Sequence, residues 1–225
     1  MKAYDLLIFD WDGTLINSIE RILFCFRRSF ETLALPAPAD AEVKQLIGLP
    51  LAESFRILFP RATGEVLERL NDAYRRIWRS ADLATSPLFP GVRPMLMRLR
   101  AAGFLLAVAT GKSREGLTRE MEEHRLTDWF QGSRCARENK AKPDPEMLRE
   151  LLEETGTEPR RALMIGDSSL DLEMAAAMAM DRIAVSSGSQ NPEVLAKSGP
   201  LACFPVVTHL EAWLEQTAGR AEAPT

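Results

Sequence analysis

Short apolar runs alternate with helical patterns over most of this chain, and this alternation limits the possible folds more than any other feature. Apolar runs of strand length lie at 4–9, 104–109, 162–165 and 182–185, and helical patterns lie at 92–102, 114–125, 145–155 and 171–179. Strands that alternate with helices typically form a parallel sheet with helices on both faces. We therefore predict an α/β protein with a Rossmann-like parallel sheet as its core.

One interval breaks the alternation, because about seventy residues after the first strand contain only helical patterns, whereas such a connection usually takes a few residues. Asn17 and Glu20 have the spacing of a capping box at a helix start. Apolar residues at helical spacing then predict four helices, at 17–33, 40–48, 51–59 and 66–78. We predict an inserted helical domain at 15–85, with 1–14 and 86–225 forming the core. Four helices lying flat on the sheet are the alternative.

Charge and apolar composition argue against several classes of protein. The 225 residues carry a net charge of -4 with no long basic block, which gives no reason to expect a nucleic-acid or membrane partner. The longest apolar runs are too short to span a bilayer, and the N-terminus lacks the pattern of a signal peptide. Three isolated cysteines are typical of reduced thiols. We expect a cytoplasmic monomer or homodimer with a frayed tail at 219–225.

Polar residues follow three of the predicted strands at the point where each strand ends. Asp10 and Asp12 come after the first strand, Thr110 and Gly111 after the second, and Asp167 after the third. The carboxyl ends of parallel strands meet at one edge of the sheet, where ligands bind. These side chains are therefore expected to form one site.

The residue types in this predicted site suit phosphoryl transfer. Asp10, Asp12, Asp167 and Asp171 offer hard oxygen ligands of the kind that Mg²⁺ prefers, and without a cation they would repel one another. The Thr110 hydroxyl, the amides near Gly111 and the Lys142 ammonium group are groups that bind anions. A metal ion together with anion-binding groups is the combination that phosphoryl transfer requires.

Four motifs occur in the order and spacing of the haloacid-dehalogenase-like superfamily: "DWDGT" at 10–14, "TGK" at 110–112, "KPDP" at 142–145 and "GDSSLD" at 166–171. The chain resembles its phosphoglycolate-phosphatase-like branch, in which a helical cap domain follows the first motif. A calcium loop also uses the pattern DxDG, but here the glycine comes too early for an EF-hand.

The resemblance implies roles for the four acids. Asp10 would be the nucleophile that forms an aspartyl-phosphate, and Asp12 the general acid and base, with its backbone carbonyl on the metal. Asp167 would bind Mg²⁺ directly, and Asp171 would act on the metal only indirectly, by contacting its ligands or through water.

The resemblance also implies which residues hold the phosphoryl group. Thr110 and Lys142 would bind its oxygens, with the backbone amides of Trp11 and Gly111 beside them. Lys142 is preferred over Lys140 because proline follows it. The sequence departs from the family pattern at two places: Trp11 replaces a smaller apolar residue, and 177–182, "AMAMDR", lacks the usual Ala-Gly before a strand.

The expected activity is Mg²⁺-dependent hydrolysis of a small-molecule phosphate monoester, with phosphoglycolate as the candidate substrate. A phosphosugar mutase and a non-catalytic phosphometabolite-binding relative are the alternatives. A mutase of this resemblance carries a basic residue after the glycine that ends the second cap helix, and 48–54, "GLPLAES", has none. The sequence leaves open whether Glu20, Arg21 or Arg56 contacts the substrate.

Overall fold

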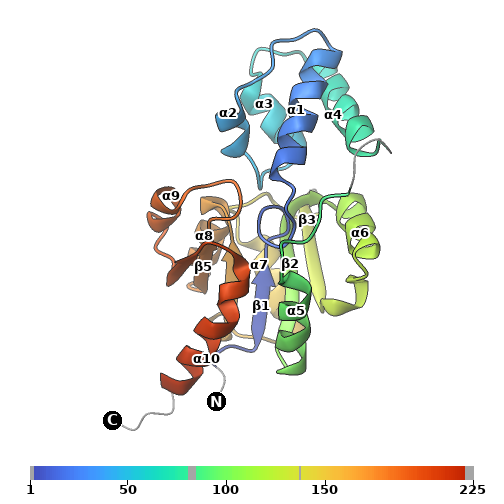
Figure 1. Cartoon of the computed structure of the whole chain (residues 1–225). Helices are drawn as coiled ribbons and strands as arrows, with labels where there is room; N and C mark the ends of the chain where they lie inside the picture. The colour runs from blue at the N-terminus through green and yellow to red at the C-terminus, as the bar shows by residue number, and fades with distance from the viewer. Residues whose placement is uncertain (1–2, 81–84, 137, 221–225) are drawn as a thin grey trace.

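Six strands form one parallel sheet in the computed structural model, which describes residues 3–80, 85–136 and 138–220 (Figure 1). The strands are β1 (Leu6–Phe9), β2 (Leu105–Ser113), β3 (Gly132–Ala136), β4 (Ala162–Gly166), β5 (Asp181–Val185) and β6 (Ala202–Phe204). Their order across the sheet is β3-β2-β1-β4-β5-β6. This is the order of the doubly wound Rossmann fold, in which the direction of winding reverses next to β1.

The pairing of β1 places the predicted site at this reversal. Phe9 at the end of β1 pairs with Val108 of β2 on one side and with Ile165 of β4 on the other. The residues that follow these three positions therefore leave the sheet at the same edge.

Helices cover both faces of the sheet, and the side chains of β1 alternate between the faces. Leu7 and Phe9 pack with α5 (Val92–Ala101), α6 (Arg114–Glu123) and α10 (Leu210–Arg220). Leu6 and Ile8 point to the other face and pack with α7 (Glu146–Thr155) and α8 (Ser169–Ala176). A short helix, α9 (Pro192–Ala196), and 3₁₀ turns at Thr127–Trp129, Pro159–Arg161 and Val207–His209 complete the core. All four β1 side chains are buried, which explains the uninterrupted apolar run.

Two strands and one helix start differ from the sequence prediction. β3 and β6 were not predicted, because both are partly exposed edge strands with little apolar pattern, and β3 includes Gly132, Ser133 and Arg134. The predicted capping box at Asn17 is wrong: Ser18 is the N-cap residue, and its side chain makes no capping bond. Asn17 lies outside the helix because its N–H donates to the Pro87 carbonyl.

Four helices follow β1 and stand beyond the carboxyl edge of the sheet (Figure 1): α1 (Ile19–Thr32), α2 (Asp40–Lys44), α3 (Leu51–Leu58) and α4 (Gly64–Trp78). They bury their own apolar cluster, in which the rings of Phe26, Phe30, Phe55 and Tyr74 contact one another. The alternative of helices lying flat on the sheet is therefore wrong. The domain boundaries at residues 15 and 85 remain a prediction.

Two chain segments join these cap helices to the core, and they run side by side. Ile16 and Leu88 form an antiparallel bridge, and the Phe89 N–H donates to the Leu15 carbonyl. This pairing holds α1 and α4 above the ends of β1 and β2. The predicted frayed tail is helical through Arg220, and 221–225 lie outside the described residues. In the described part of the chain, no helix is both long enough and apolar enough to cross a membrane.

Candidate active site

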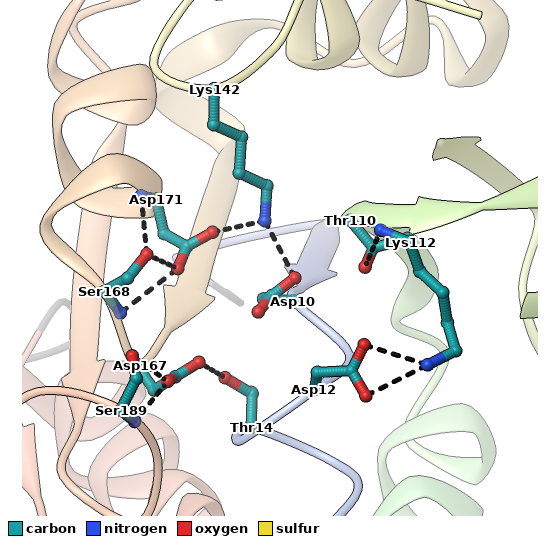
Figure 2. Close-up of polar contacts among 10 residues, drawn as sticks. All are labelled: Asp10, Asp12, Thr14, Thr110, Lys112, Lys142, Asp167, Ser168, Asp171 and Ser189. Carbon is teal, nitrogen blue, oxygen red and sulfur yellow. Dashed lines mark hydrogen bonds and ion pairs between the residues drawn. The ribbon is translucent and has the colours of Figure 1, made fainter. Parts of the chain in front are cut away.

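Asp10 lies directly after β1, where its carboxylate is buried against Lys142 (Figure 2). The Lys142 Nζ lies 2.7 Å from Asp10 Oδ1 and 2.5 Å from Asp171 Oδ1. Burial lowers the pKa of Lys142, but the two carboxylates outweigh burial and the pKa is raised. Lys142 is therefore a fixed buried cation. Lys140 is exposed and lies 3.6 Å from Asp144.

Asp171 is held at the start of α8 by both of its oxygens. Its Oδ2 accepts hydrogen bonds from the Ser168 N–H and from Ser168 Oγ, at 3.2 and 2.6 Å, in a capping box. Its Oδ1 accepts the hydrogen bond from Lys142. Asp171 thus orients Lys142 and caps the helix at the same time.

Asp167 follows β4 and is held by residues from two other segments. Its Oδ1 accepts a hydrogen bond from Thr14 Oγ1 at 3.1 Å, and its Oδ2 accepts bonds from the Ser189 N–H and Oγ at 2.7 and 2.9 Å. Burial and the Asp171 charge raise its pKa to about 6. Thr14 and Ser189 were not predicted as site residues from the sequence, although Thr14 belongs to the "DWDGT" motif.

Asp10, Asp167 and Asp171 form a buried acidic cluster whose ligand oxygens lie within 4.8 Å of one another. Burial raises the pKa of Asp10 well above its usual range, even though Lys142 opposes this shift. One lysine cannot balance three carboxylates, so the cluster fits a divalent cation with a preference for oxygen ligands. Asp10 and Asp167 are the better direct ligands, because Asp10 borders the cavity and Asp167, among the described residues, accepts hydrogen bonds only from neutral groups. Asp171 instead is tied to the Lys142 ammonium group and to the start of α8.

Asp12 lies apart from this cluster and faces Lys112, a residue that was not predicted as part of the site. The Lys112 Nζ lies 3.1 and 3.0 Å from the two Asp12 carboxylate oxygens (Figure 2). The Lys112 N–H donates to Thr110 Oγ1 at 3.2 Å, which holds the Thr110 side chain beside the cavity. The position of Lys112 in the "TGK" motif was the sequence signal that could have placed it in the site. The predicted contact between the Asp12 backbone carbonyl and the metal stays a prediction.

Two glycines allow the backbone to approach closely at this site. Gly13 has a φ of +85°, and a Cβ there would clash with the Asp167 carboxylate. Gly111 lies against the backbone of Gly48 from the cap, leaving no room for a Cβ. The predicted phosphate-binding segment at Gly111 is thus directly below a cap loop.

A cavity of about 160 Å³ lies between the cap and the strand ends. Asp10, Asp12, Thr110, Gly111 and Lys112 line it from the core. The cap contributes apolar and aromatic side chains, from Ile22, Phe26, Leu49, Pro50, Tyr74 and Trp78. Three arginines also line it: Arg75, Arg79 and Arg119.

The three cap charges left open by the sequence lie elsewhere. Glu20 is exposed. The Arg21 guanidinium group stacks over the Trp78 ring, with its Cζ 4.4 Å from the ring centroid. Arg56 is exposed and lines a different groove on the cap. The cations that border the cavity were therefore not those considered from the sequence.

Comparison with known proteins agrees with this geometry. The sequence model of a family described as haloacid dehalogenase-like hydrolase matches residues 7–185. The chain is 31% identical to a tyrosine-protein kinase, PtkA, of Mycobacterium tuberculosis, over 92% of this chain and 69% of that one. It is also 31% identical to a phosphoglycolate phosphatase of Rhodospirillum rubrum, over 92% of this chain and 90% of that one.

A solved structure has the same fold. The chain is 29% identical to a haloacid dehalogenase-like hydrolase from Bacteroides fragilis, with a TM-score of 0.83 over 92% of this chain and 99% of that one. The family match spans both the first strand, before Asp10, and the Asp167–Asp171 segment, so it includes the whole acidic cluster. This chain belongs to the haloacid dehalogenase-like hydrolase family, with the inserted helical cap of its phosphoglycolate-phosphatase-like branch.

Proposed function

We propose that this protein is a Mg²⁺-dependent phosphatase that hydrolyses a small phosphate monoester through an aspartyl-phosphate on Asp10. The observation that carries the proposal is the setting of Asp10. Its carboxylate borders the cavity, one of its oxygens is held by Lys142, and it belongs to the acidic cluster. Among the described residues, only Lys142 donates a hydrogen bond to this carboxylate, which leaves Oδ2 available for attack.

In the first step Asp10 Oδ2 attacks the phosphorus atom, and the bond from phosphorus to the leaving oxygen breaks. Asp12 gives that oxygen a proton as it departs. Thr110 and Lys142 stabilise the negative charge on the transferring group, and Lys142 holds Asp10 in place. When bound by Asp10 and Asp167, Mg²⁺ neutralises charge on the phosphate and the carboxylates.

In the second step water hydrolyses the aspartyl-phosphate. Asp12, now deprotonated, removes a proton from the water as it attacks phosphorus, and the bond to Asp10 breaks to release inorganic phosphate. The same residue therefore serves as acid and then as base. Its carboxylate lines the cavity beside Thr110, where both protons would be exchanged.

The cavity favours a substrate that is small and carries a second anionic group. Its volume of about 160 Å³ is below the ~300–1,000 Å³ typical of sites for drug-sized ligands. Arg75 borders it, and the nearest acid paired with Arg75, Asp72, is 3.9 Å away, so the guanidinium group is only weakly engaged. A carboxylate two atoms from the ester oxygen would suit this arrangement. The related protein from Rhodospirillum rubrum is a phosphoglycolate phosphatase, and we propose 2-phosphoglycolate as the first candidate.

Hydrolysis is favoured over mutase chemistry by the cap loop above Gly111. A mutase must grip a sugar bisphosphate, but Gly48–Leu51 brings only apolar side chains to the cavity. The test is a panel of phosphate monoesters with the full-length protein and Mg²⁺, measuring inorganic phosphate. We expect release from 2-phosphoglycolate above that from hexose phosphates.

Two outcomes of this panel would contradict the proposal. Isomerisation of hexose 1-phosphates, with a catalytic amount of bisphosphate and little phosphate release, would show a mutase. Transfer of phosphate from a nucleotide to a tyrosine peptide, without release from small monoesters, would show the activity for which the mycobacterial relative is named.

A further inference from the structure

Trp11 stands between Asp10 and Asp12, and its side chain has a partner that its sequence position does not reveal. The ring is fully buried, and its Nε1–H donates a hydrogen bond to Glu120 Oε2 at 2.7 Å. The edge of the ring packs against Phe130. The phosphate-binding role expected of this residue uses only the backbone amide, so the indole N–H is free to act elsewhere.

Glu120 of α6 is a buried acid, only 1% exposed, that the proposed mechanism does not use. A carboxylate removed from water is costly unless charged or hydrogen-bonding groups surround it. Trp11 contacts one of its oxygens, and the Lys112 Nζ forms an ion pair with the other, Oε1, at 3.1 Å. Glu120 therefore joins the indole of the catalytic loop to the lysine at the end of β2.

Lys112 completes a closed circuit, because its Nζ also contacts both Asp12 oxygens at 3.0 and 3.1 Å. The contacts run from Trp11 to Glu120, then to Lys112 and back to Asp12, the neighbour of Trp11 in sequence. Each side chain in the circuit is nearly or fully buried, and that of Asp12 is 14% exposed. A flexible lysine by itself would not hold a carboxylate in one orientation. Here the ion pair with Glu120 also fixes the position of the Lys112 ammonium group.

The cap fixes the same ammonium group from a second side. The Lys112 Nζ lies 4.5 Å from the centroid of the Trp78 ring, at the end of α4. Trp78 is itself stacked on Tyr74 and covered by Arg21. A cation over an aromatic face is attracted to the ring, more strongly where water is excluded. The place of Lys112 thus depends on the core through Glu120 and on the cap through Trp78.

We propose that Trp11, Glu120 and Lys112 are positioning residues that hold the Asp12 carboxyl in the orientation from which it exchanges protons with the leaving oxygen and with water. This inference rests on the phosphatase function proposed above. It also gives a reason for tryptophan at position 11, since phenylalanine or an aliphatic residue has no N–H for Glu120. A group misplaced by about 1 Å can lose about 10²-fold in rate, so this orientation matters.

The test compares two aryl esters that differ in how much they need a proton from Asp12. Phenyl phosphate has a poor leaving group, whereas p-nitrophenyl phosphate has a good one that departs without protonation. Glu120→Gln keeps an acceptor for Trp11 but weakens the hold on Lys112. We expect its kcat for phenyl phosphate to fall roughly 10- to 100-fold, with less than about a threefold change in KM and in kcat for p-nitrophenyl phosphate.

Trp11→Phe provides a second variant, because it keeps an aromatic ring and removes only the N–H contact and some volume. We expect the same split between the two substrates, in the same direction. Glu122→Gln is the matched control: it makes the same chemical change on an exposed residue of α6 and should leave kcat and KM for both esters unchanged.

Each other result has a definite reading. Equal loss with both esters would overturn the inference in favour of a merely structural role. A rise in KM for both, with kcat retained, would show that the circuit binds substrate instead. Wild-type protein inactive on both esters and on 2-phosphoglycolate would mean that the phosphatase proposal itself is wrong, which separates the two failures.

Discussion

Gly111 of the core and Gly48 of the cap are in backbone contact, so closely that a Cβ at position 111 would overlap the Gly48 carbonyl group. The contact joins the end of β2 to the loop that covers the cavity. This contact therefore fixes the position of the cap loop relative to the proposed phosphate-binding segment.

Gly111→Ala should push this cap loop away from Thr110 and reduce kcat/KM by roughly 10- to 100-fold. The alanine cannot be accommodated by a side-chain shift, because the group that it meets is backbone. Gly64→Ala is the control, since a Cβ there meets nothing within 4 Å at the start of α4. It should leave kcat/KM unchanged and raise the free energy of unfolding by about 0.4–1 kcal/mol. Equal activity of the two variants would show that the contact does not matter.

Asp10→Asn should abolish turnover while the fold survives. The amide has nearly the shape of the carboxylate but is a poor nucleophile and cannot form the aspartyl-phosphate. Loss of one charge from the acidic cluster also removes like-charge repulsion, so the melting temperature should not fall. Steady-state release of phosphate and thermal unfolding measure the two effects. Substantial turnover in a folded variant would contradict covalent catalysis.

Mg²⁺ should raise the melting temperature more at pH 7.5 than at pH 5. The pKa of Asp167 is raised to about 6 from its ordinary value of 3.8, mainly by burial and then by Asp171. The folded protein therefore binds this proton more tightly than the unfolded chain, so without metal its stability falls as the pH rises from about 4 to about 6. Mg²⁺ competes with that proton and restores the lost stability at the higher pH.

Two matched variants locate this metal effect. Asp167→Asn should remove most of the Mg²⁺-dependent rise in melting temperature, because Asp167 is a proposed direct ligand. Asp171→Asn should retain more of the rise but lower the melting temperature without metal, since Asp171 forms the buried ion pair with Lys142 and caps α8 through Ser168. The reverse pattern would mean that Asp171 is the direct metal ligand and Asp167 is not. Activity should vanish with a chelator and return with Mg²⁺.

Arg75→Gln should weaken binding of a substrate with a second anionic group. A hydrogen bond to a charged group contributes about 1.5–3 kcal/mol, so the KM for 2-phosphoglycolate should rise roughly 10- to 100-fold. The KM for p-nitrophenyl phosphate, which lacks the carboxylate, should stay within about threefold of wild type. Arg56→Gln is the control, since Arg56 is exposed and is not among the described residues that line the cavity. A rise in KM for both substrates would place Arg75 at the phosphate instead.

Ala179→Gly should stabilise the protein without changing its activity. Ala179 is exposed and has a φ of +51°, in the turn that precedes β5. A left-handed conformation costs a non-glycine residue about 1–2 kcal/mol, and the greater freedom of glycine in the unfolded chain offsets part of the gain. We expect the free energy of unfolding to rise by up to about 1 kcal/mol. Ala176→Gly, in the last turn of α8, should lower it by up to about 1 kcal/mol.

The parallel α/β core and the inserted cap could be predicted from the sequence, because both depend on patterns of residues close together along the chain. The apolar run before Asp10 predicts a buried strand, and the absence of strand patterns over the following helices predicts the insertion. Within the 177–182 segment, which departs from the family pattern, Ala179 takes a left-handed conformation in the turn before β5. The edge strands β3 and β6 were missed because half-exposed strands carry little apolar pattern.

For the candidate site, the sequence by itself placed Asp10, Thr110 and Asp167 at one edge, because residues that follow parallel strands must meet there. Tertiary structure alone decided which charged groups pair. Trp11 and Glu120 are 109 positions apart, and Asp12 and Lys112 are 100 apart. Such contacts depend on the rotation of α6 on the sheet and on the seating of the cap against Gly111. Both are set by packing between distant segments, so no pattern of neighbouring residues could reveal them.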